Sequence, residues 1–297
     1  MSRAIVLAAP AKVNLSLEIV GRRADGYHEL VSIFATVDLA DRVRVAVGGS
    51  LDVRIRPDVD APEGEDLGTR AVRALAAATG RAAAAHVRIR KRIPVASGLG
   101  GGSSDAGAVL CALARLWRVD TDLGPVAATV GSDVPFFVAG APYALVRGRG
   151  ESVAAIPSPA LPLWLVLVRV RARVSTPAVF AALRQDDWTD GAETTGLATS
   201  FVAGTIDPAR LRAASRNGLL AAAERVCPAI AEVRAAALAR GVELALSGSG
   251  PTLYRIADDR ADALRVSRQL RRIGLDARPY VLGVALSAKR ASAVPLR

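Results

Sequence analysis

The sequence predicts an α/β protein, and three observations support this fold class. Residues in the first half alternate between apolar and polar as in strands, a glycine-rich run separates a basic strand from an apolar helix, and a strand–helix–strand pattern closes the chain. The chain has 297 residues, of which 51% are hydrophobic and 23% charged. It is therefore long enough for one large domain or two modest ones with their own cores.

The stretch before the glycine-rich run is expected to contain several strands and one helix. Residues 11–20 alternate, with apolar side chains on one face and Lys12, Asn14 and Ser16 on the other. Because alternate residues of a strand stand about 6.5–7 Å apart on one face, Lys12 and Asn14 can reach a common cleft, although an ordinary solvent face explains them as well. Further strands are expected at residues 29–38, 42–47, 51–55 and 85–93, and a helix between residues 67 and 80.

The most informative segment runs from Pro94 to Asp105 and reads Pro-Val-Ala-Ser-Gly-Leu-Gly-Gly-Gly-Ser-Ser-Asp. Glycines lack the Cβ atoms that keep backbone N–H groups away from a ligand. Residues 106–117 then show apolar side chains at helical spacing, with Ser103 or Ser104 as the expected N-cap. A loop that opens into a helix N-terminus offers unpaired donors and the positive end of the helix dipole. We therefore expect this loop to hold the phosphates of a nucleotide.

The loop fits neither common phosphate-binding motif. A Walker loop requires a lysine after its last glycine, but Ser103 follows Gly102. The Rossmann fingerprint requires a third glycine at the position where this chain has Ser103. Asp120 lies near the distance expected for a ribose ligand, which keeps the Rossmann alternative open. A flexible linker is disfavoured, because the segment joins a strand to a strongly periodic helix. Lys91 lies on the apolar side of the preceding strand and either reaches solvent or faces a ligand; we favour the ligand.

The second half is expected to be mainly helical and to end in a βαβ pattern. A small-residue loop at 247–251 lies between two of its strands, and the composition changes near residues 157–162, which divides the chain into 1–157 and 158–297. The expected strands are 143–147, 162–170, 242–246, 251–256 and 275–282, and the expected helices are 176–183, 207–226, 228–240 and 258–273.

The charge of the chain bears on its partners. A formal net charge of +11 suits nucleic acid, but the arginines are spread along the chain and only 4% of residues are aromatic, which leaves little for base stacking. Small phosphorylated metabolites fit as well, and we expect these rather than nucleic acid; RNA binding stays the alternative from a different class. Lysine occurs only at positions 12, 91 and 289, so arginine serves wherever any cation suffices.

The sequence also favours a location. Cys111 and Cys227 are too few for a disulfide framework, which indicates a reducing cytoplasm. No run of 18 apolar residues appears, so we expect no membrane association. Two histidines and two cysteines at scattered positions make no zinc site. Ser249 does not match a nucleophile elbow, because Ser247 stands where the motif has its first glycine. The catalytic histidine of such enzymes also follows the serine in the chain, whereas both histidines here precede it.

Five segments together resemble the GHMP kinase family. They are the loop 94–105, the N-terminal stretches 10–15 and 25–30, and the later stretches 131–136 and 247–251. The resemblance follows nearly the whole chain in order. It implies a two-domain α/β (α+β) fold, in which residues 1–157 bind ATP, residues 158–297 form a ferredoxin-like domain, and an active-site cleft lies between them.

The signatures are similar to those of one member of this family in particular. This resemblance implies an ATP-dependent kinase that phosphorylates the 2-hydroxyl of a cytidine diphosphate-linked methylerythritol in non-mevalonate isoprenoid biosynthesis, with ATP and Mg²⁺ as cofactors. It implies Asp133 as acid/base, Lys12 as its cationic partner and Asn14 as a polyol contact. Around the cytidine it implies Tyr27, His28, Thr176 and Phe180. Around ATP it implies Lys91, Pro94, Val95, Ala96, Ser97, Gly98, Leu99, Gly100, Gly101, Gly102, Ser103 and Ser104.

Plainer interpretations remain beside these roles. Asp133 can be a capping residue before a turn, and Tyr27 and Phe180 can be core residues. The chain also departs from the family pattern: it has Asp66 where an asparagine is frequent near the adenine, and Gly218 where an aspartate is frequent. Glycine stands where other GHMP kinases place a Mg²⁺-binding serine, so no protein ligand of Mg²⁺ is assigned. A homoserine or mevalonate kinase of the same fold is the alternative within the family.

Overall fold

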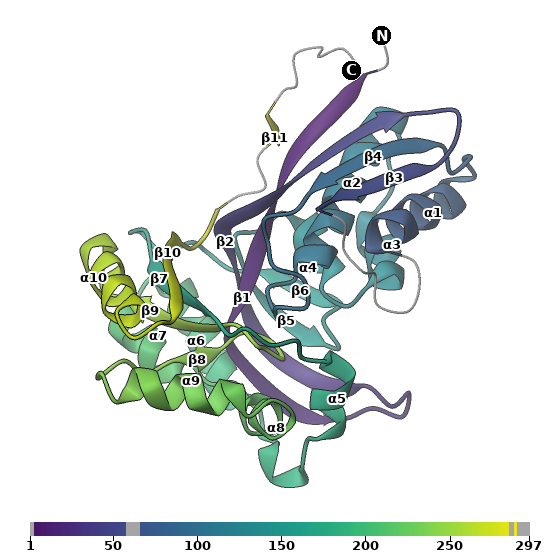
Figure 1. The fold of residues 1–297 in the computed structure, drawn as a ribbon. Helices are drawn as coiled ribbons and strands as arrows, with labels where there is room; N and C mark the ends of the chain where they lie inside the picture. The colour runs from purple at the N-terminus through teal and green to yellow at the C-terminus, as the bar shows by residue number, and fades with distance from the viewer. Residues whose placement is uncertain (1–2, 58–65, 285–287, 290–297) are drawn as a thin grey trace.

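The computed structural model describes residues 3–57, 66–284 and 288–289, which form two sheets with helices packed against them (Figure 1). In the larger sheet, the strand order is β11-β1-β2-β4-β3, with β5 beside β2 and β6 beside β5. β3 runs parallel to β4, and the other pairs are antiparallel. The bounds are β1 (Ala4–Arg22), β2 (His28–Val47), β3 (Asp52–Arg56), β4 (Ala85–Arg90), β5 (Tyr143–Gly148), β6 (Ser152–Ala155) and β11 (Ala288–Lys289).

Helices cover one face of this sheet, as Figure 1 shows for α1, α2 and α3. Alternation along β2 and β4 turns Val43, Val45 and Val87 toward these helices, where they pack in a core with Leu75 and Leu110. The opposite face of the same strands carries polar residues. The bounds are α1 (Leu67–Thr79), α2 (Gly101–Trp117), α3 (Leu123–Val130) and α4 (Val134–Ala139).

The smaller sheet has the antiparallel order β10-β7-β9-β8. β9 and β10 lie on either side of β7 and are joined by α10, which is the split βαβ arrangement of ferredoxin-like folds. The strands are β7 (Trp164–Arg169), β8 (Ala245–Leu246), β9 (Leu253–Ala257) and β10 (Asp276–Val281). The helices are α5 (Thr176–Ala181), the 3₁₀ helix η1 (Gln185–Asp187), α6 (Ala192–Val202), α7 (Pro208–Ala214), α8 (Leu220–Val226), α9 (Ala229–Leu238) and α10 (Arg260–Arg271).

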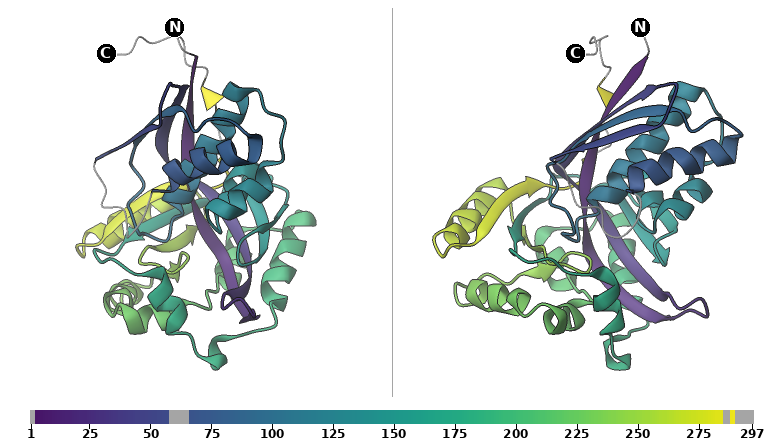
Figure 2. Two further views of the ribbon diagram at one scale, coloured as in Figure 1. Left: turned by 90° about the vertical axis from the view of Figure 1, so that its right-hand side faces the viewer. Right: turned by 45° about the vertical axis from the view of Figure 1, so that its right-hand side comes forward.

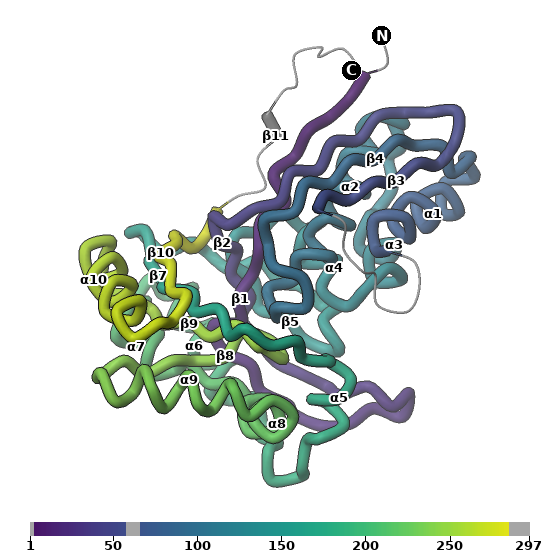
Figure 3. The backbone as a smooth tube through the Cα atoms, in the orientation of Figure 1, coloured from purple at the N-terminus to yellow at the C-terminus, as the bar shows by residue number. Residues whose placement is uncertain are grey.

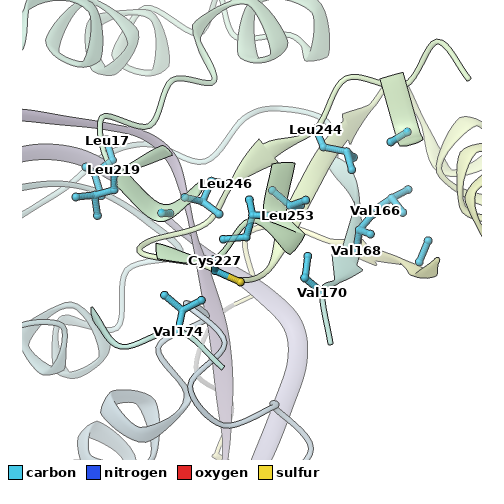
Figure 4. Close-up of a cluster of buried hydrophobic side chains, with 14 of the residues drawn as sticks. Leu17, Val166, Val168, Val170, Val174, Leu219, Cys227, Leu244, Leu246 and Leu253 are labelled. Carbon is cyan, nitrogen blue, oxygen red and sulfur yellow. The ribbon is translucent and has the colours of Figure 1, made fainter. Parts of the chain in front are cut away.

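The β1–β2 hairpin connects the two halves of the molecule. In the views of Figure 2 and along the tube of Figure 3, its strands pass from beside β4 to the region of α5 and α8. Leu17, Ile19 and Leu30 from this hairpin belong to the same buried cluster as residues of the smaller sheet. Figure 4 shows Leu17 beside Leu219 in that cluster. The larger sheet thus supplies part of the core of the second half, and the division at residue 157 stays a prediction.

The fold class is confirmed, with local differences from the expected elements. The strands expected at 29–38 and 42–47 form one strand, β2, because bulges absorb the breaks in alternation. The helix expected at 207–226 is two helices, interrupted where Asn217 turns its side chain to other backbone groups. Helix α2 begins at Gly101, so neither Ser103 nor Ser104 is its N-cap. No helix in the described ranges combines the length and apolar character needed to cross a bilayer.

Candidate active site

The glycine-rich loop is shaped by residues with left-handed backbone angles. Ala96, Gly98 and Gly100 have φ values of 50°, 75° and 67°. A Cβ on Gly98 would collide with the carbonyl oxygen of Ser247 and lie 2.9 Å from that of Gly250. Only glycine permits this approach, because both obstacles are backbone atoms of the second small-residue loop. The two loops that the sequence analysis singled out separately therefore lie against each other.

Hydrogen bonds fix this contact between the loops. The Ser247 hydroxyl donates to the Gly98 carbonyl at 3.1 Å, and the Thr252 amide donates to the Ser97 carbonyl at 3.3 Å. Beyond the contact, Gly100 is the N-cap of α2 and the first intrahelical bond runs from the Ser104 amide to the Gly100 carbonyl. The amides of the first turn have no earlier helical carbonyl to bind, so they are free for an anion.

Lys12 lies beside this loop at the centre of the site. Its side chain is buried and its Nζ donates to Asn14 Oδ1 at 2.7 Å, while Asp133 Oδ2 lies 3.4 Å away. The ammonium also stands 4.6 Å from the centre of the Phe34 ring, a cation–π distance. A Cβ on Gly100 would lie 3.0 Å from Lys12 Cγ, so the loop confines the lysine stem. The polar face of residues 12–16 is thus buried and does not face solvent.

Asn14 is held in one orientation by its neighbours. Its Nδ2 donates to the Ser32 hydroxyl at 2.9 Å, and that hydroxyl donates to the Ser16 carbonyl at 2.6 Å. With the amide nitrogen occupied in this way, Asn14 Oδ1 faces the Lys12 ammonium. Bridges of this kind between β1 and β2 hold the two polar side chains rigidly.

Asp133 stands at the start of α4 with its carboxylate unused by the helix. It occupies the N-cap position, but its side chain makes no capping hydrogen bond. Its φ and ψ of −88° and −8° are helical rather than the extended angles of an ordinary cap. The side chain is 29% exposed, against 5% for Lys12. A structural capping role is therefore absent, and the carboxylate is available to a ligand in the cleft.

Lys91 belongs to a buried cluster of charges. Its Nζ contacts Asp41 Oδ2 at 2.5 Å and Asp105 Oδ2 at 2.7 Å, and Asp41 also accepts the backbone amides of Arg92 and Ile93. Burial raises the pKa of Asp105 to about 7, with Lys91 opposing and Asp41 adding to the shift. Burial lowers the pKa of Lys91, but the two carboxylates outweigh it and the net direction is upward. Lys91 thus holds β4 to α2 while its side chain borders the cleft.

A cleft of about 1900 Å³ collects most of the predicted site residues. This exceeds the roughly 300–1,000 Å³ of a pocket for one drug-sized ligand, and leaves room for two nucleotide-sized molecules. Two predicted ATP contacts do not line it: Leu99 is a core residue, and Ser104 is fully buried. The predicted residues that line it are Lys12, Asn14, Tyr27, His28, Lys91, Pro94, Val95, Ala96, Ser97, Gly98, Gly100, Gly101, Gly102, Ser103, Asp133, Thr176 and Phe180.

Aromatic side chains gather at the end of the cleft formed by β2 and α5. The His28 and Phe180 rings lie 5.3 Å apart, and Trp188 meets His28 edge-on at 6.4 Å. Tyr27 is 51% exposed, and the Arg149 guanidinium stands 5.1 Å from its ring centre. Burial and the charge of Arg22 lower the pKa of His28, which favours the neutral imidazole. Tyr27 is therefore not a core residue, whereas Phe180 is partly buried against the core of the second half and also lines the cleft.

Other residues in and behind this cleft were not predicted from the sequence. Trp188 lines it and its Nε1 is buried without a hydrogen-bond partner among the described residues. Arg149 also lines it, but one arginine in so basic a chain carries no signal by itself. Asn217 supports the small-residue loop 247–251, because its Nδ2 donates to the carbonyls of Leu246 and Gly248, both at 2.9 Å. Thr176 shares a 2.7 Å hydrogen bond with Ser249 of that loop.

The opposite end of the cleft lies against β3, β4 and the start of α1. Its apolar wall consists of Val53, Ile55, Leu67 and Ile89, which suits the face of a planar ring. Asp66 lines this end, but its carboxylate accepts the Thr69 amide at 2.9 Å and the Thr69 hydroxyl at 2.6 Å as the N-cap of α1. Asp66, which stands where the family frequently has an asparagine, thus has a structural role as the cap of α1 in this chain.

Comparisons with known proteins agree with this geometry. The model of the GHMP kinases N terminal domain matches residues 66–141, and that of the GHMP kinases C terminal domain matches residues 201–275. A 4-diphosphocytidyl-2-C-methyl-D-erythritol kinase of Pelotomaculum thermopropionicum is 37% identical over 275 residues, which cover 90% of this chain and 94% of the relative.

Solved structures extend the comparison. A crystal structure of 4-(cytidine 5'-diphospho)-2C-methyl-D-erythritol kinase superimposes with a TM-score of 0.74 and 35% identity, and the match covers 94% of this chain and all of that one. A homoserine kinase from Cytophaga hutchinsonii gives a TM-score of 0.69, with coverage of 96% and 95% of the two chains, but only 19% identity. That second likeness shows the shared fold alone.

Proposed function

Because the chain belongs to the GHMP kinases, and within them to the 4-diphosphocytidyl-2-C-methyl-D-erythritol kinases, we propose that it transfers the γ-phosphoryl group of ATP to the 2-hydroxyl of 4-diphosphocytidyl-2-C-methyl-D-erythritol. This reaction would place it in non-mevalonate isoprenoid biosynthesis. The observation that carries the proposal is the Lys12–Asp133 pair, which stands between the glycine-rich loop and the aromatic end of one cleft.

The pair suits transfer to an alcohol. A carboxylate that makes no capping hydrogen bond can accept the proton of the attacking hydroxyl, and an ammonium 3.4 Å away can orient that hydroxyl and offset negative charge as it develops. Asn14 fixes the ammonium through its Oδ1 and lies where a polyol hydroxyl would bind. Phosphoryl transfer depends mainly on such positioning and electrostatics.

The loop and the apolar wall suit ATP. The triphosphate would lie against the amides that open α2, next to the left-handed Gly98 and Gly100. The adenine would lie on the wall that includes Val53 and Leu67. Lys91, whose ammonium is held by two carboxylates, would support the loop from β4 rather than bind a phosphate as a free cation.

The aromatic end suits the cytosine. Phe180 and the exposed Tyr27 offer ring faces for stacking, and a neutral His28 offers one donor and one acceptor to the base edge. The unpartnered Trp188 Nε1 is a further donor in the same region. Cytidine recognition would thus use residues of β2, α5 and the turn after η1.

Mg²⁺ would enter with the triphosphate. The described residues contain no group of three or more His, Cys, Asp or Glu side chains that could hold a metal ion. Mg²⁺ usually keeps several waters and takes few protein oxygens besides phosphates, so the triphosphate and water would supply most of its ligands. The cation would supply charge neutralisation of the phosphates.

An acceptor comparison tests the proposal. ADP release from ATP and Mg²⁺ is measured with 4-diphosphocytidyl-2-C-methyl-D-erythritol, homoserine or mevalonate as the acceptor. We expect turnover only with the cytidine compound. Turnover with homoserine or mevalonate instead would assign the chain to another GHMP activity.

The cytidine end can be tested separately. Phe180→Ala removes one ring face, so we expect KM for the cytidine substrate to rise about tenfold or more, in line with about 1–3 kcal/mol per stacked base. KM for ATP should stay unchanged. Leu161→Ala, at a side chain that is 78% exposed, is the control. Equal KM values for the cytidine substrate in Phe180→Ala and the control would remove Phe180 from recognition.

A further inference from the structure

Six arginines form a grid on the sheet face that the helices leave uncovered. They come in pairs from three neighbouring strands: β2 supplies Arg42 and Arg44, β4 supplies Arg88 and Arg90, and β3 supplies Arg54 and Arg56. The register sets them directly opposite one another, because Arg44 pairs with Arg88, which pairs with Arg54, and Arg42 pairs with Arg90, which pairs with Arg56. We call these six residues the arginine face.

The arginine face is poorly compensated. Asp52 pairs with Arg88 at 2.8 Å and with Arg54 at 3.2 Å, and within the described ranges no ion pair involves Arg42, Arg44, Arg56 or Arg90. Like charges directly opposite in a sheet destabilise it. A folded chain that keeps six arginines in facing positions therefore carries repulsion that a bound anion would relieve.

The arginine face is hollowed rather than flat. A cavity of about 770 Å³ is lined by the six arginines together with Pro57, Ile89 and Lys91. Among the described residues, no acidic or aromatic side chain belongs to this lining. The volume falls within the roughly 300–1,000 Å³ of small-molecule pockets, and the lack of aromatic rings removes the stacking platform that single-stranded nucleic acid uses.

From these observations we propose that the arginine face is a second binding site for a small ligand that carries several phosphate groups. It adjoins the catalytic cleft, whose lining shares Arg54, Arg56, Ile89 and Lys91 with it. Neighbouring strands stand about 4.7–4.9 Å apart and alternate residues about 6.5–7 Å, so the grid spans about 7 by 10 Å. That span matches an oligophosphate chain. Guanidinium groups bind phosphate oxygens in pairs, so arginines that face one another across strands suit this ligand.

Calorimetric titration with tripolyphosphate tests this site in the presence of saturating ADP, which occupies the catalytic loop. The triple variant Arg42→Gln/Arg44→Gln/Arg90→Gln removes three arginines that do not line the catalytic cleft. The matched control is Arg268→Gln/Arg271→Gln/Arg272→Gln, which lowers the net charge equally at exposed positions at the end of α10.

We expect the wild type and the control to bind one tripolyphosphate per chain, and the triple variant to bind at least tenfold more weakly. Its melting temperature should be unchanged or higher, because facing charges are removed. Equal affinity in all three proteins would overturn the site. Tighter binding of a single-stranded RNA than of tripolyphosphate, lost in the triple variant, would instead make this face a nucleic-acid surface and overturn the small ligand.

Discussion

Lys12 Nζ lies 3.4 Å from Asp133 Oδ2, although one residue belongs to the first strand and the other precedes α4. The lysine is confined by Gly100 of the phosphate loop, and a Cβ on Gly248 of the second loop would lie 3.5 Å from its Nζ. The two charges therefore meet where both glycine loops converge. One cleft thus brings together a place for a phosphate, a carboxylate that can accept a proton, and a place for the hydroxyl that would receive the phosphoryl group.

Asp133→Asn removes the proton acceptor and keeps the shape of the side chain. We expect kcat to fall by about two orders of magnitude or more, the scale of general-base loss, with ATP affinity nearly unchanged. Steady-state kinetics and calorimetric titration with ATP give the two values. Near-normal turnover in a folded variant would remove Asp133 from the mechanism.

Lys12→Arg keeps the charge and changes its shape. A guanidinium is larger than an ammonium and planar, and its donors point in fixed directions. The space beside Gly100 and Phe34 fits a compact ammonium. Since a displacement of about 1 Å in a reacting group can cost about a hundredfold in rate, we expect most turnover to be lost while ATP still binds. Lys289→Arg is the control and should change almost nothing. Unchanged kcat in both would reduce Lys12 to a general positive charge.

Gly98→Ala tests the contact between the two loops. The new Cβ would meet the carbonyls of Ser247 and Gly250 in a left-handed conformation, so we expect a loss of about 1–3 kcal/mol in the free energy of unfolding, together with weaker ATP binding. Gly102→Ala is the matched control, because its nearest neighbour is Leu67 Cδ1 at 3.4 Å and its φ is not positive. If urea unfolding shows equal losses in both variants, the loop contact is not tight.

Asp105 makes stability depend on pH. Its pKa of about 7 in the folded chain exceeds the ordinary 3.8. Between these two pH values, the folded chain therefore keeps a proton on Asp105 that the unfolded chain has released. Its contribution is present below about pH 4 and is lost as pH rises through about 7. We expect the wild type to lose stability relative to Asp105→Asn between pH 5 and 8 in urea unfolding. A difference that stays constant over this range would contradict a raised pKa.

The parts of the site that share one element could be predicted from the sequence. Period-two alternation placed Lys12 and Asn14 on one face of a strand, and the glycine run before a periodic helix indicated a phosphate loop. Burial of that strand face could not be predicted, because it depends on elements distant in the chain. The meeting of Gly98 with Ser247 likewise depends on how the two sheets pack.

Residues whose partners come from other elements were placed only by the structure. Lys91 was expected at a ligand, yet its ammonium lies between Asp41 of β2 and Asp105 of α2, and no local pattern connects these three positions. Trp188 follows a single 3₁₀ turn and has no periodicity to reveal its face. The facing arginines were hidden for a different reason: arginine is frequent throughout the chain, and only strand register sets those of β2, β4 and β3 opposite each other.

Phosphorus NMR of the reaction product tests the central claim most directly. The chain is incubated with ATP, Mg²⁺ and 4-diphosphocytidyl-2-C-methyl-D-erythritol, and Asp133→Asn serves as the parallel sample. We expect one new phosphomonoester on the methylerythritol part, formed in step with ADP, with the cytidine diphosphate linkage intact and little product from the variant. Inorganic phosphate without a new monoester, or cleavage of the diphosphate linkage, would contradict phosphoryl transfer to this hydroxyl.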